Sequence, residues 1–291
     1  MLSKTIRERI KALKENYLFL KPGKESLLLL IEEAELPEAV YNSNAIENST
    51  LTLRETERVL FEGEVGRSVS TREVYEAKNL ARVTERLRDT SPTDDLTKDE
   101  ILELHAMLMG GINDHIAGRF RGPGERVRVG MHIAPAAEQV ERMLENALAE
   151  YVNDHESHDL AKVARFHLEF EYIHPFNDGN GRIGRVLINR ELRRLGFPPI
   201  IIRDKEKKVY YRAFGEYERG KNTKPMERIL ALSVMESLHK RISYMTGDEL
   251  IPLAQYARER DLSVHALLNQ ARRQTIPAFR EQGVWIISKR A

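Results

Sequence analysis

The sequence predicts a mainly α-helical protein that carries a short β-hairpin and a small C-terminal domain of winged-helix type. Three observations point to this fold class. Apolar residues recur at helical spacing over most of the chain. Ser/Thr-x-x-Glu patterns precede several of these runs, as capping boxes precede helices. The main departure is residues 118–134, where side chains alternate at the period of a strand.

The helices are marked by start and stop signals. Charged and apolar residues follow helical spacing from Leu2 to about Leu20, and a Lys-Pro-Gly sequence then ends the run. A later helix begins near Ala161, breaks around Pro175 and resumes as far as Leu195. Three candidate capping boxes mark further helix starts: Thr52 with Glu55, Ser70 with Glu73, and Thr97 with Glu100.

The hairpin is predicted from two short alternating segments. Residues 119–121 and residues 127–129 alternate at strand period, and Gly122-Pro123-Gly124 between them is a strong turn signal. We therefore expect these two segments to pair. Because an isolated hairpin is marginal in water, we expect it to pack on helices or to grip a ligand.

The tail differs from the rest of the chain in composition and charge. Residues 251–291 carry seven Lys/Arg and three Asp/Glu, whereas residues 1–250 carry 39 and 42, so a net charge of +1 conceals a basic tail. A predicted linker, residues 245–252, precedes it. We expect an N-terminal helical region (1–95), a core domain (96–245) and a separate C-terminal module (251–291).

The module itself is predicted to be a helix-turn-helix followed by a strand. Residues 253–268 have the spacing of two short helices, and Val284 to Ile287 form an apolar strand that includes Trp285. The segment around Ile276-Pro277-Ala278-Phe279 resembles DNA-binding modules of the excisionase and MerR type. DNA is therefore one expected partner, and a helical accessory domain that binds protein is the alternative.

Composition excludes several function classes. The chain of 291 residues is 41% hydrophobic and 31% charged, so it can bury a full core. It contains no cysteine, which excludes disulfides, thiol catalysis and thiolate metal sites. The longest apolar run, residues 27–31, is too short to cross a bilayer, and the first ten residues lack an apolar signal segment. We expect a cytoplasmic protein with no membrane partner.

Residues 174–185, HPFNDGNGRIGR, are the most informative stretch. Gly179 and Gly181 let backbone amides approach a ligand closely. The residues that follow have helical spacing, so these amides stand at a helix N-terminus, which attracts anions. Arg182 and Arg185 lie three residues apart and project from the same helix face. Together these features predict a polyphosphate site.

Two further side chains of the stretch supply chemistry beside that site. Asp178 is a hard oxygen ligand, and the Mg²⁺ that accompanies a triphosphate is usually held by one or two carboxylates and phosphate oxygens. His174 ends the preceding helix, where an imidazole that titrates near neutral pH can take a proton from an attacking hydroxyl. Phe176 is predicted to anchor the loop.

The stretch resembles, at every fixed position, the signature His-Pro-Phe-x-Asp/Glu-Gly-Asn-Gly-Arg-x-x-Arg of the Fic family. The resemblance implies a Fic-type helical bundle that transfers AMP from ATP to a Ser, Thr or Tyr hydroxyl of a target protein, or of itself. It implies that His174 deprotonates the hydroxyl, Asp178 holds Mg²⁺ and Arg185 binds the γ-phosphate. The residues implied to hold the phosphates are Gly179, Asn180, Gly181, Arg182 and Arg185.

Two other segments resemble parts of the Fic fold. The hairpin looks like the family's flap, which holds a target segment as an added strand by main-chain pairing. The flap residues implied in target binding are Val127, Arg128, Val129 and Gly130. Tyr210 and Tyr211 resemble the family's tyrosines near the nucleotide base, although the asparagine that the family has shortly after them is not evident and Glu218 stands near its expected place.

Residues 43–48, SNAIEN, are similar to the Fic inhibitory motif Ser/Thr-x-x-x-Glu-Gly/Asn. Ser43 and Glu47 lie on one face of a helical turn, in an inhibitory helix expected at about residues 38–49. The resemblance implies that Glu47 pairs with Arg185 and denies it to the γ-phosphate. The α-phosphate is then not held in line for attack, so we expect a self-inhibited enzyme.

Alternatives from other classes stay open at this point. The same residues suit removal of AMP from a target, or transfer of another nucleotide or of a phosphate to a hydroxyl. A regulator that senses a nucleotide and binds DNA through residues 251–291 is a third possibility. A homodimer, which is common in the family, is also compatible with the sequence.

Overall fold

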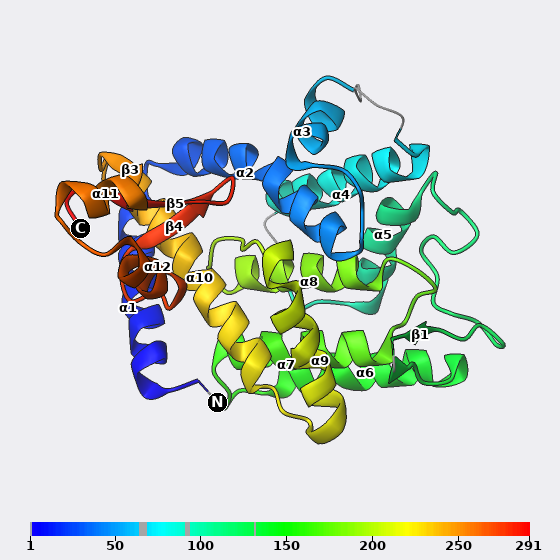
Figure 1. The fold of residues 1–291 in the computed structure, drawn as a ribbon. Coiled ribbons are helices and arrows are strands. Elements are labelled where there is room, and N and C mark those ends of the chain that lie inside the picture. Colours follow the sequence, from blue (N-terminus) through cyan, green and yellow to red (C-terminus); the bar gives the residue numbers. More distant parts are fainter. Residues whose placement is uncertain (1, 64–68, 91–93, 131) are drawn as a thin grey trace. The chain divides into compact units, whose positions relative to one another are not determined.

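The computed structural model describes residues 2–63, 69–90, 94–130 and 132–291. Its chain divides into two compact units, which are traced by colour in Figure 1. Unit 1 consists of Leu36–Leu195 and Ile201–Glu227. Unit 2 consists of Leu2–Glu35, Gly196–Ile200 and Arg228–Ala291. The division falls within two long helices, α2 (Glu25–Ile46) and α10 (Lys224–Met245).

Unit 1 is mainly helical, as the sequence predicts. Besides parts of α2 and α10 it contains α3 (Leu53–Phe61), α4 (Thr71–Thr90), α5 (Lys98–Met109), α6 (Ala137–Asn153), α7 (Asp159–Ile173), α8 (Asn180–Arg194), the short 3₁₀ helix η1 (Asp204–Glu206) and α9 (Lys207–Gly220). Helix α7 packs against α6, α8 and α9, and α8 also packs against α4 and α5. The end of α7 and the start of α8 are therefore held from several sides.

The three predicted capping boxes all mark helix starts, but only one is complete. Thr52 and Glu55 form the reciprocal pair at α3. Thr97 caps α5, while the Glu100 carboxylate instead binds the buried guanidinium of Arg190. Ser70 likewise accepts the Glu73 amide, and the Glu73 carboxylate turns to residues 49 and 50. Tertiary partners thus override the local pattern in two of the three boxes.

The predicted pairing of residues 119–121 with residues 127–129 is wrong. The hairpin consists of β1 (Arg128–Val129) and β2 (His132–Ile133), which pair antiparallel. Arg121 is instead buried, and its guanidinium donates to the carbonyl oxygens of Ile173 and His174 at 3.2 and 2.8 Å. A charged donor that satisfies the carbonyl groups at the end of α7 outweighs the local strand pattern of the segment.

Unit 2 consists of helices and a small sheet. It contains α1 (Lys4–Leu20), most of α10, β3 (Leu250–Pro252), α11 (Leu253–Glu259), α12 (Val264–Arg272), β4 (Ala278–Glu281) and β5 (Val284–Ser288). The strands form an antiparallel sheet in the order β3-β5-β4. Gln282 and Gly283 both have positive φ, which suits the two-residue turn between β4 and β5.

The sheet and its two short helices enclose a core of their own. Its buried members are Ile251, Leu253, Tyr256, Ala257, Leu267, Ala271, Ala278 and Ile287. Trp285 packs against this core, in agreement with its predicted place in the C-terminal module. No helix in the described parts of the chain is both long and apolar enough to cross a membrane.

Candidate active site

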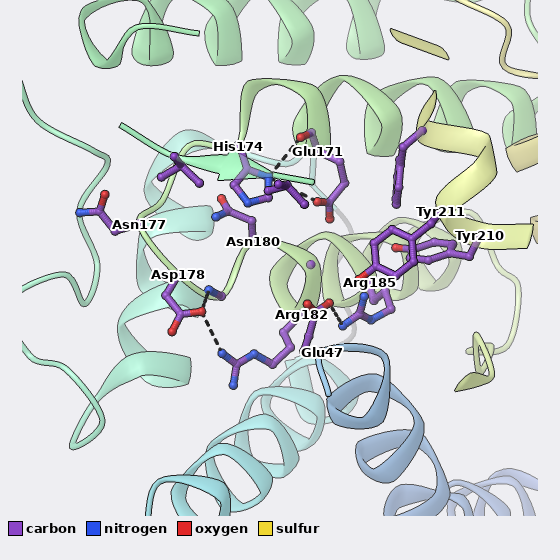
Figure 2. Close-up of a pocket in the computed structure, with 15 residues that line it drawn as sticks. Glu47, Glu171, His174, Asn177, Asp178, Asn180, Arg182, Arg185, Tyr210 and Tyr211 are labelled. Atoms are coloured by element: carbon purple, nitrogen blue, oxygen red, sulfur yellow. Dashed lines mark hydrogen bonds and ion pairs between the residues drawn. The ribbon is translucent and has the colours of Figure 1, made fainter. Parts of the chain in front are cut away.

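A cavity of about 240 Å³ lies where α7 ends and α8 begins (Figure 2). Most residues that the sequence singles out line it together: Glu47, Val127, Val129, His174, Asp178, Gly179, Asn180, Gly181, Arg182, Arg185, Tyr210 and Tyr211. Ser43, Arg128 and Gly130 are not among the lining residues. Ser43 contacts Arg185, and the side chain of the exposed Arg128 donates a hydrogen bond to the Gly130 carbonyl. The structure thus gathers residues that are up to 164 positions apart in the chain, from Glu47 to Tyr211.

His174 has a fixed tautomer. It caps α7 in the left-handed region, at φ 49° and ψ 63°, and its Nδ1 lies 3.2 Å from the carbonyl oxygen of Glu171. Because a carbonyl oxygen only accepts hydrogen bonds, Nδ1 carries the proton and Nε2 is left as the basic nitrogen. Burial lowers the pKa of His174 to about 4, so the ring is neutral and able to accept a proton at neutral pH.

The loop between the two helices is clamped by Asn180. The side-chain oxygen of Asn180 accepts the Phe176 amide at 2.9 Å, and its side-chain nitrogen donates to the Phe176 carbonyl at 2.8 Å. Phe176 is fully buried and stacks on the His105 ring at a centroid distance of 3.6 Å. His105 also lies 3.0 Å from the carbonyl oxygen of Asp178. The clamp fixes the loop without consuming its charged groups.

The first turn of α8 forms an anion cradle. Gly179 precedes the helix at φ 81°, and the Ile183 amide is already bonded to the Gly179 carbonyl at 2.9 Å. The backbone amides before Ile183 are the donors that a helix N-terminus leaves unpaired. A Cβ added at Gly181 would clash with the Glu47 carboxylate. A carboxylate therefore already occupies the space above this cradle.

A charge network stands on one side of the cradle. Arg182 is 3% exposed and binds Glu76 of α4 at 3.1 Å and Asp178 at 3.4 Å. Arg72 also pairs with both acids. Burial alone would raise the pKa of Asp178, but Arg182, the Gly179 amide and Arg72 together lower it. Asp178 is therefore ionised at the cavity rim, where it could serve as an oxygen ligand for a cation.

Arg185 lies on the other side and is held by the segment at the end of α2. Its Nε donates to the Ser43 hydroxyl at 2.9 Å, and its Nη2 donates to the Ser43 carbonyl at 2.8 Å and to Glu47 at 2.9 Å. Asn48 has φ 69°, the left-handed geometry that favours Gly or Asn after a helix. That turn follows the end of α2 at Ile46. In Figure 2 the Glu47 side chain points toward Arg185.

A second cavity of about 270 Å³ adjoins the first and shares Val129, Glu171, His174, Tyr211 and Phe214 with it. Aromatic side chains form much of its wall, which also contains Glu218. The Nδ1 of His132 lies 2.9 Å from the Glu218 carboxylate, and its Nε2 lies 2.9 Å from the Tyr172 carbonyl oxygen. These contacts fasten β2 of the hairpin beside both cavities.

The two tyrosines have different environments. Tyr210 is buried, its hydroxyl lies 2.8 Å from Nε2 of His167, and Arg185 stands over its ring. Tyr211 is 36% exposed, and its hydroxyl lies 3.4 Å from the Ile46 carbonyl oxygen. Tyr210 therefore supports the arginine from behind, and Tyr211 forms part of the cavity wall.

Sequence reasoning missed several residues that build this site. Arg121 and His105 hold the loop from outside, and Glu171 lines both cavities. Glu76 binds Arg182, and Arg72 binds Glu76 and Asp178. None belongs to a motif, because each acts through tertiary contacts with a distant segment. The only available signal was the helical spacing of Glu171, three residues before His174.

Comparisons with known proteins agree on the family. Residues 95–192 match the model of the Fic/DOC family. The chain is 31% identical over 232 residues to the protein adenylyltransferase Fic of Nematostella vectensis, which covers 77% of this chain and 52% of that protein. The chain thus spans about half the length of the curated relatives it matches, with 50% of the Drosophila melanogaster protein as another example.

Two solved structures share the architecture. Fic-1 of C. elegans superposes with a TM-score of 0.72 at 26% identity, over 84% of this chain and 73% of that one. A Fic domain-containing signalling protein from Bacteroides thetaiotaomicron gives a TM-score of 0.74 over 83% of this chain and 98% of that one. Its identity of 24% makes this likeness one of fold.

Proposed function

This chain is a Fic/DOC family protein, and from that premise we propose that it is a self-inhibited protein adenylyltransferase. It transfers AMP from ATP to a Ser, Thr or Tyr hydroxyl of a target protein or of itself. The observation that carries the proposal is the cavity in which a neutral His174, an anion cradle and Arg185 meet, with Glu47 paired to Arg185. Its curated relatives are protein adenylyltransferases.

The transfer step follows from the tautomer of His174. Nε2 takes the proton of the target hydroxyl while the hydroxyl oxygen attacks the α-phosphorus. The bond from the α-phosphorus to the bridging oxygen breaks, so AMP is joined to the target and pyrophosphate leaves. The amides before Ile183, together with Arg182 and Arg185, hold the phosphate oxygens. Positioning and charge stabilisation supply most of the catalysis in such chemistry.

Asp178 is the residue that would hold Mg²⁺. Its ionised carboxylate lies at the rim of the cradle, and Mg²⁺ in nucleotide sites commonly takes one or two protein carboxylates together with phosphate oxygens. When bound there, Mg²⁺ would supply positive charge that offsets part of the phosphate charge. Arg72, which pairs with Asp178 here, would exchange that partner for solvent or phosphate.

Glu47 is the brake in this proposal. While it binds Arg185, the guanidinium cannot bind the γ-phosphate, and the negative carboxylate above Gly181 repels the phosphates. ATP bound in this state lacks the alignment of its α-phosphate with the target hydroxyl. Misalignment alone suffices to suppress a reaction that depends on positioning.

The proposal is tested by labelled-ATP transfer. We expect wild type to label itself or a target weakly, Glu47→Gly to raise the signal on the order of a hundredfold, and Glu47→Gly/His174→Ala to lose it, because a general base contributes about 10²–10⁴-fold. Equal signal from wild type and Glu47→Gly would reject the brake. Persistent signal in the double variant would reject His174 as the base.

The same site suits two related reactions, namely removal of AMP and transfer of another nucleotide or a phosphate. Glu218, a carboxylate in the wall of the second cavity, is the feature that keeps other bases in consideration. A panel of ATP, GTP, CTP and UTP with the Glu47→Gly variant distinguishes them by the mass added to the product. Incubating an AMP-modified product with wild type tests removal.

A second candidate function is DNA binding by residues 251–291. The support is the combination of α11 and α12 with a three-stranded sheet, the order found in winged helices, and the polar and basic exposed face of α12. The exposed polar residues are His265, Gln270 and Arg272 on α12 and Arg273 directly after it, and Val264 and Ala266 are exposed beside them. We expect full-length protein to bind duplex DNA in fluorescence anisotropy with a strong salt dependence, and Arg272→Ala/Arg273→Ala to lose it.

Arg258→Ala/Arg260→Ala is the matched control, because it removes the same charge from exposed positions outside α12. Equal loss in both variants would mean that net charge, and not α12, carries the binding. No binding at low salt would favour a module that binds protein.

A further inference from the structure

Glu171 is a buried carboxyl group for which the family motif gives no role. It lies one helical turn before His174 on α7 and lines both the phosphate cavity and the aromatic cavity beside it. In Figure 2 it stands beside His174, between that ring and Arg185. A buried carboxyl group is costly unless it is paired, so this position calls for a physical explanation.

The contacts of Glu171 point at His174. The Nδ1 of His174 lies 3.2 Å from the Glu171 carbonyl oxygen and 3.7 Å from its Oε2. The other carboxyl oxygen, Oε1, is buried with no hydrogen-bond partner among the described residues. It packs directly on Gly184, where an added Cβ would clash with it. The carboxyl group is thus sterically confined next to the nitrogen that faces away from the reacting hydroxyl.

The surroundings of Glu171 contain charges of both signs. The titratable and charged groups that face it are His167 and His174 on α7, Arg185 on α8, Glu47 after α2, and Tyr210 and Tyr211 on α9. Burial raises the pKa of Glu171 to about 8, with Arg185 acting against that rise and Glu47 adding to it. Because Glu47 adds to the rise, its departure from the cavity would shift the pKa of Glu171 downward.

We propose that Glu171 is a positioning residue for the transfer step, which tunes the basicity of His174 through Nδ1 and does so only when Glu47 has left Arg185. This rests on the proposed function. When Nε2 takes the hydroxyl proton, positive charge forms on the ring, and a carboxylate at Nδ1 stabilises that charge. A neutral carboxyl group cannot. Burial keeps the pKa of the His174 ring low, so the ring is a weak base without such help.

Glu47 then acts twice. Docked on Arg185, it occupies the γ-phosphate partner, and its negative charge also favours the protonated form of Glu171. Its departure lowers the pKa of Glu171 and leaves a carboxylate beside His174. Release of the brake and activation of the base are therefore one event in this proposal.

Nuclear magnetic resonance tests the coupling without any transfer activity. In wild type with ¹⁵N-labelled histidine, and with His174 assigned by comparison with His174→Ala, we expect the His174 ring signal to move in a step centred near pH 8. Glu171→Gln should abolish that step, and Glu47→Gly should move it to lower pH. The matched control is Glu169→Gln on the same helix, which contacts Tyr217 and Lys221 instead and should retain the step.

Two results would overturn the proposal: no step in wild type, or the same step in Glu171→Gln. If Glu171→Gln does not fold, the shift of the midpoint between wild type and Glu47→Gly decides in its place, since an unchanged midpoint removes the link to the brake.

Kinetics in the released background give the second readout. Against Glu47→Gly, we expect Glu47→Gly/Glu171→Gln to lower kcat about tenfold or more, to leave KM for the nucleotide within about twofold, and to lose the rise of kcat with pH. An unchanged kcat and pH profile would overturn the proposal. If Glu47→Gly shows no transfer at all, the proposed function fails, and the resonance experiment still decides the role of Glu171.

Discussion

The loop of residues 174–185 and the segment of residues 43–48 meet at Arg185 but are held in different ways. The loop is fixed from within by the Asn180 side chain and from outside by Arg121 and His105. The segment contributes Ser43 and Glu47, and the Glu47 side chain is 35% exposed against 7% for Arg185. The loop that carries the proposed reactive groups is thus held by buried contacts, whereas Glu47, the proposed inhibiting group, is held by a partly exposed contact that can be exchanged.

The largest loss of transfer activity is expected when the Asn180 side chain, which fixes the loop of residues 174–185, is removed. In the Glu47→Gly background, Asn180→Ala should lower transfer about a hundredfold, because two buried hydrogen bonds to the Phe176 backbone are lost and each unpaired group costs about 1–3 kcal/mol. Steady-state labelling measures this. Asn189→Ala, on the same helix, is the matched control. Activity retained by the Asn180 variant would show that the loop does not need its clamp.

A smaller effect is expected from the segment. Ser43→Ala in otherwise wild-type protein should raise basal transfer about tenfold, since the hydroxyl that accepts from Arg185 Nε is lost while the Ser43 carbonyl stays. A hydrogen bond to a charged group contributes about 1.5–3 kcal/mol, and about 1.4 kcal/mol is tenfold. Ser26→Ala, at an exposed position of the same helix, serves as the control. A fall in basal transfer would mean that Ser43 serves Arg185 in catalysis rather than in restraint.

The smallest effect on basal transfer is expected from a change in salt concentration. Raising NaCl from about 0.05 to about 0.5 M should increase wild-type basal transfer about twofold, because a partly exposed ion pair is weakened by screening. Glu47→Gly, measured in parallel, corrects for salt effects on the reaction itself. If both proteins respond alike, screening of the Glu47–Arg185 pair is not what limits wild type.

The sequence predicts the residues of contiguous motifs better than the residues that act through tertiary contacts. The residues of the 174–185 stretch and Glu47 belong to contiguous patterns, so their types and spacing alone indicate a site. Arg121 was predicted in a strand, yet it caps α7, because the buried carbonyl oxygens that bind it come from residues 52 and 53 positions further along the chain. His105 belongs to no pattern, and the only signal for Glu171 is its helical spacing from His174. Their roles arise only when helices bring distant segments together.

The C-terminal module was also predicted only in part from the sequence. Helical and strand periodicity indicated α11, α12 and β5, while β3 escaped notice because Leu250–Pro252 is only three residues long and lies within the predicted linker. It pairs with β5 and is the third strand of the sheet. A short strand is defined by its partner more than by its own residues.

The left-handed backbone conformation of His174 lowers the folding stability of the protein. A residue other than glycine in the left-handed region loses about 1–2 kcal/mol of folding stability, and glycine would avoid that loss. Selection for thermostability alone would therefore favour glycine at position 174, and selection for the reaction opposes it. Stabilising substitutions in this protein should be sought elsewhere, for natural sequences retain such local instability where an activity depends on it.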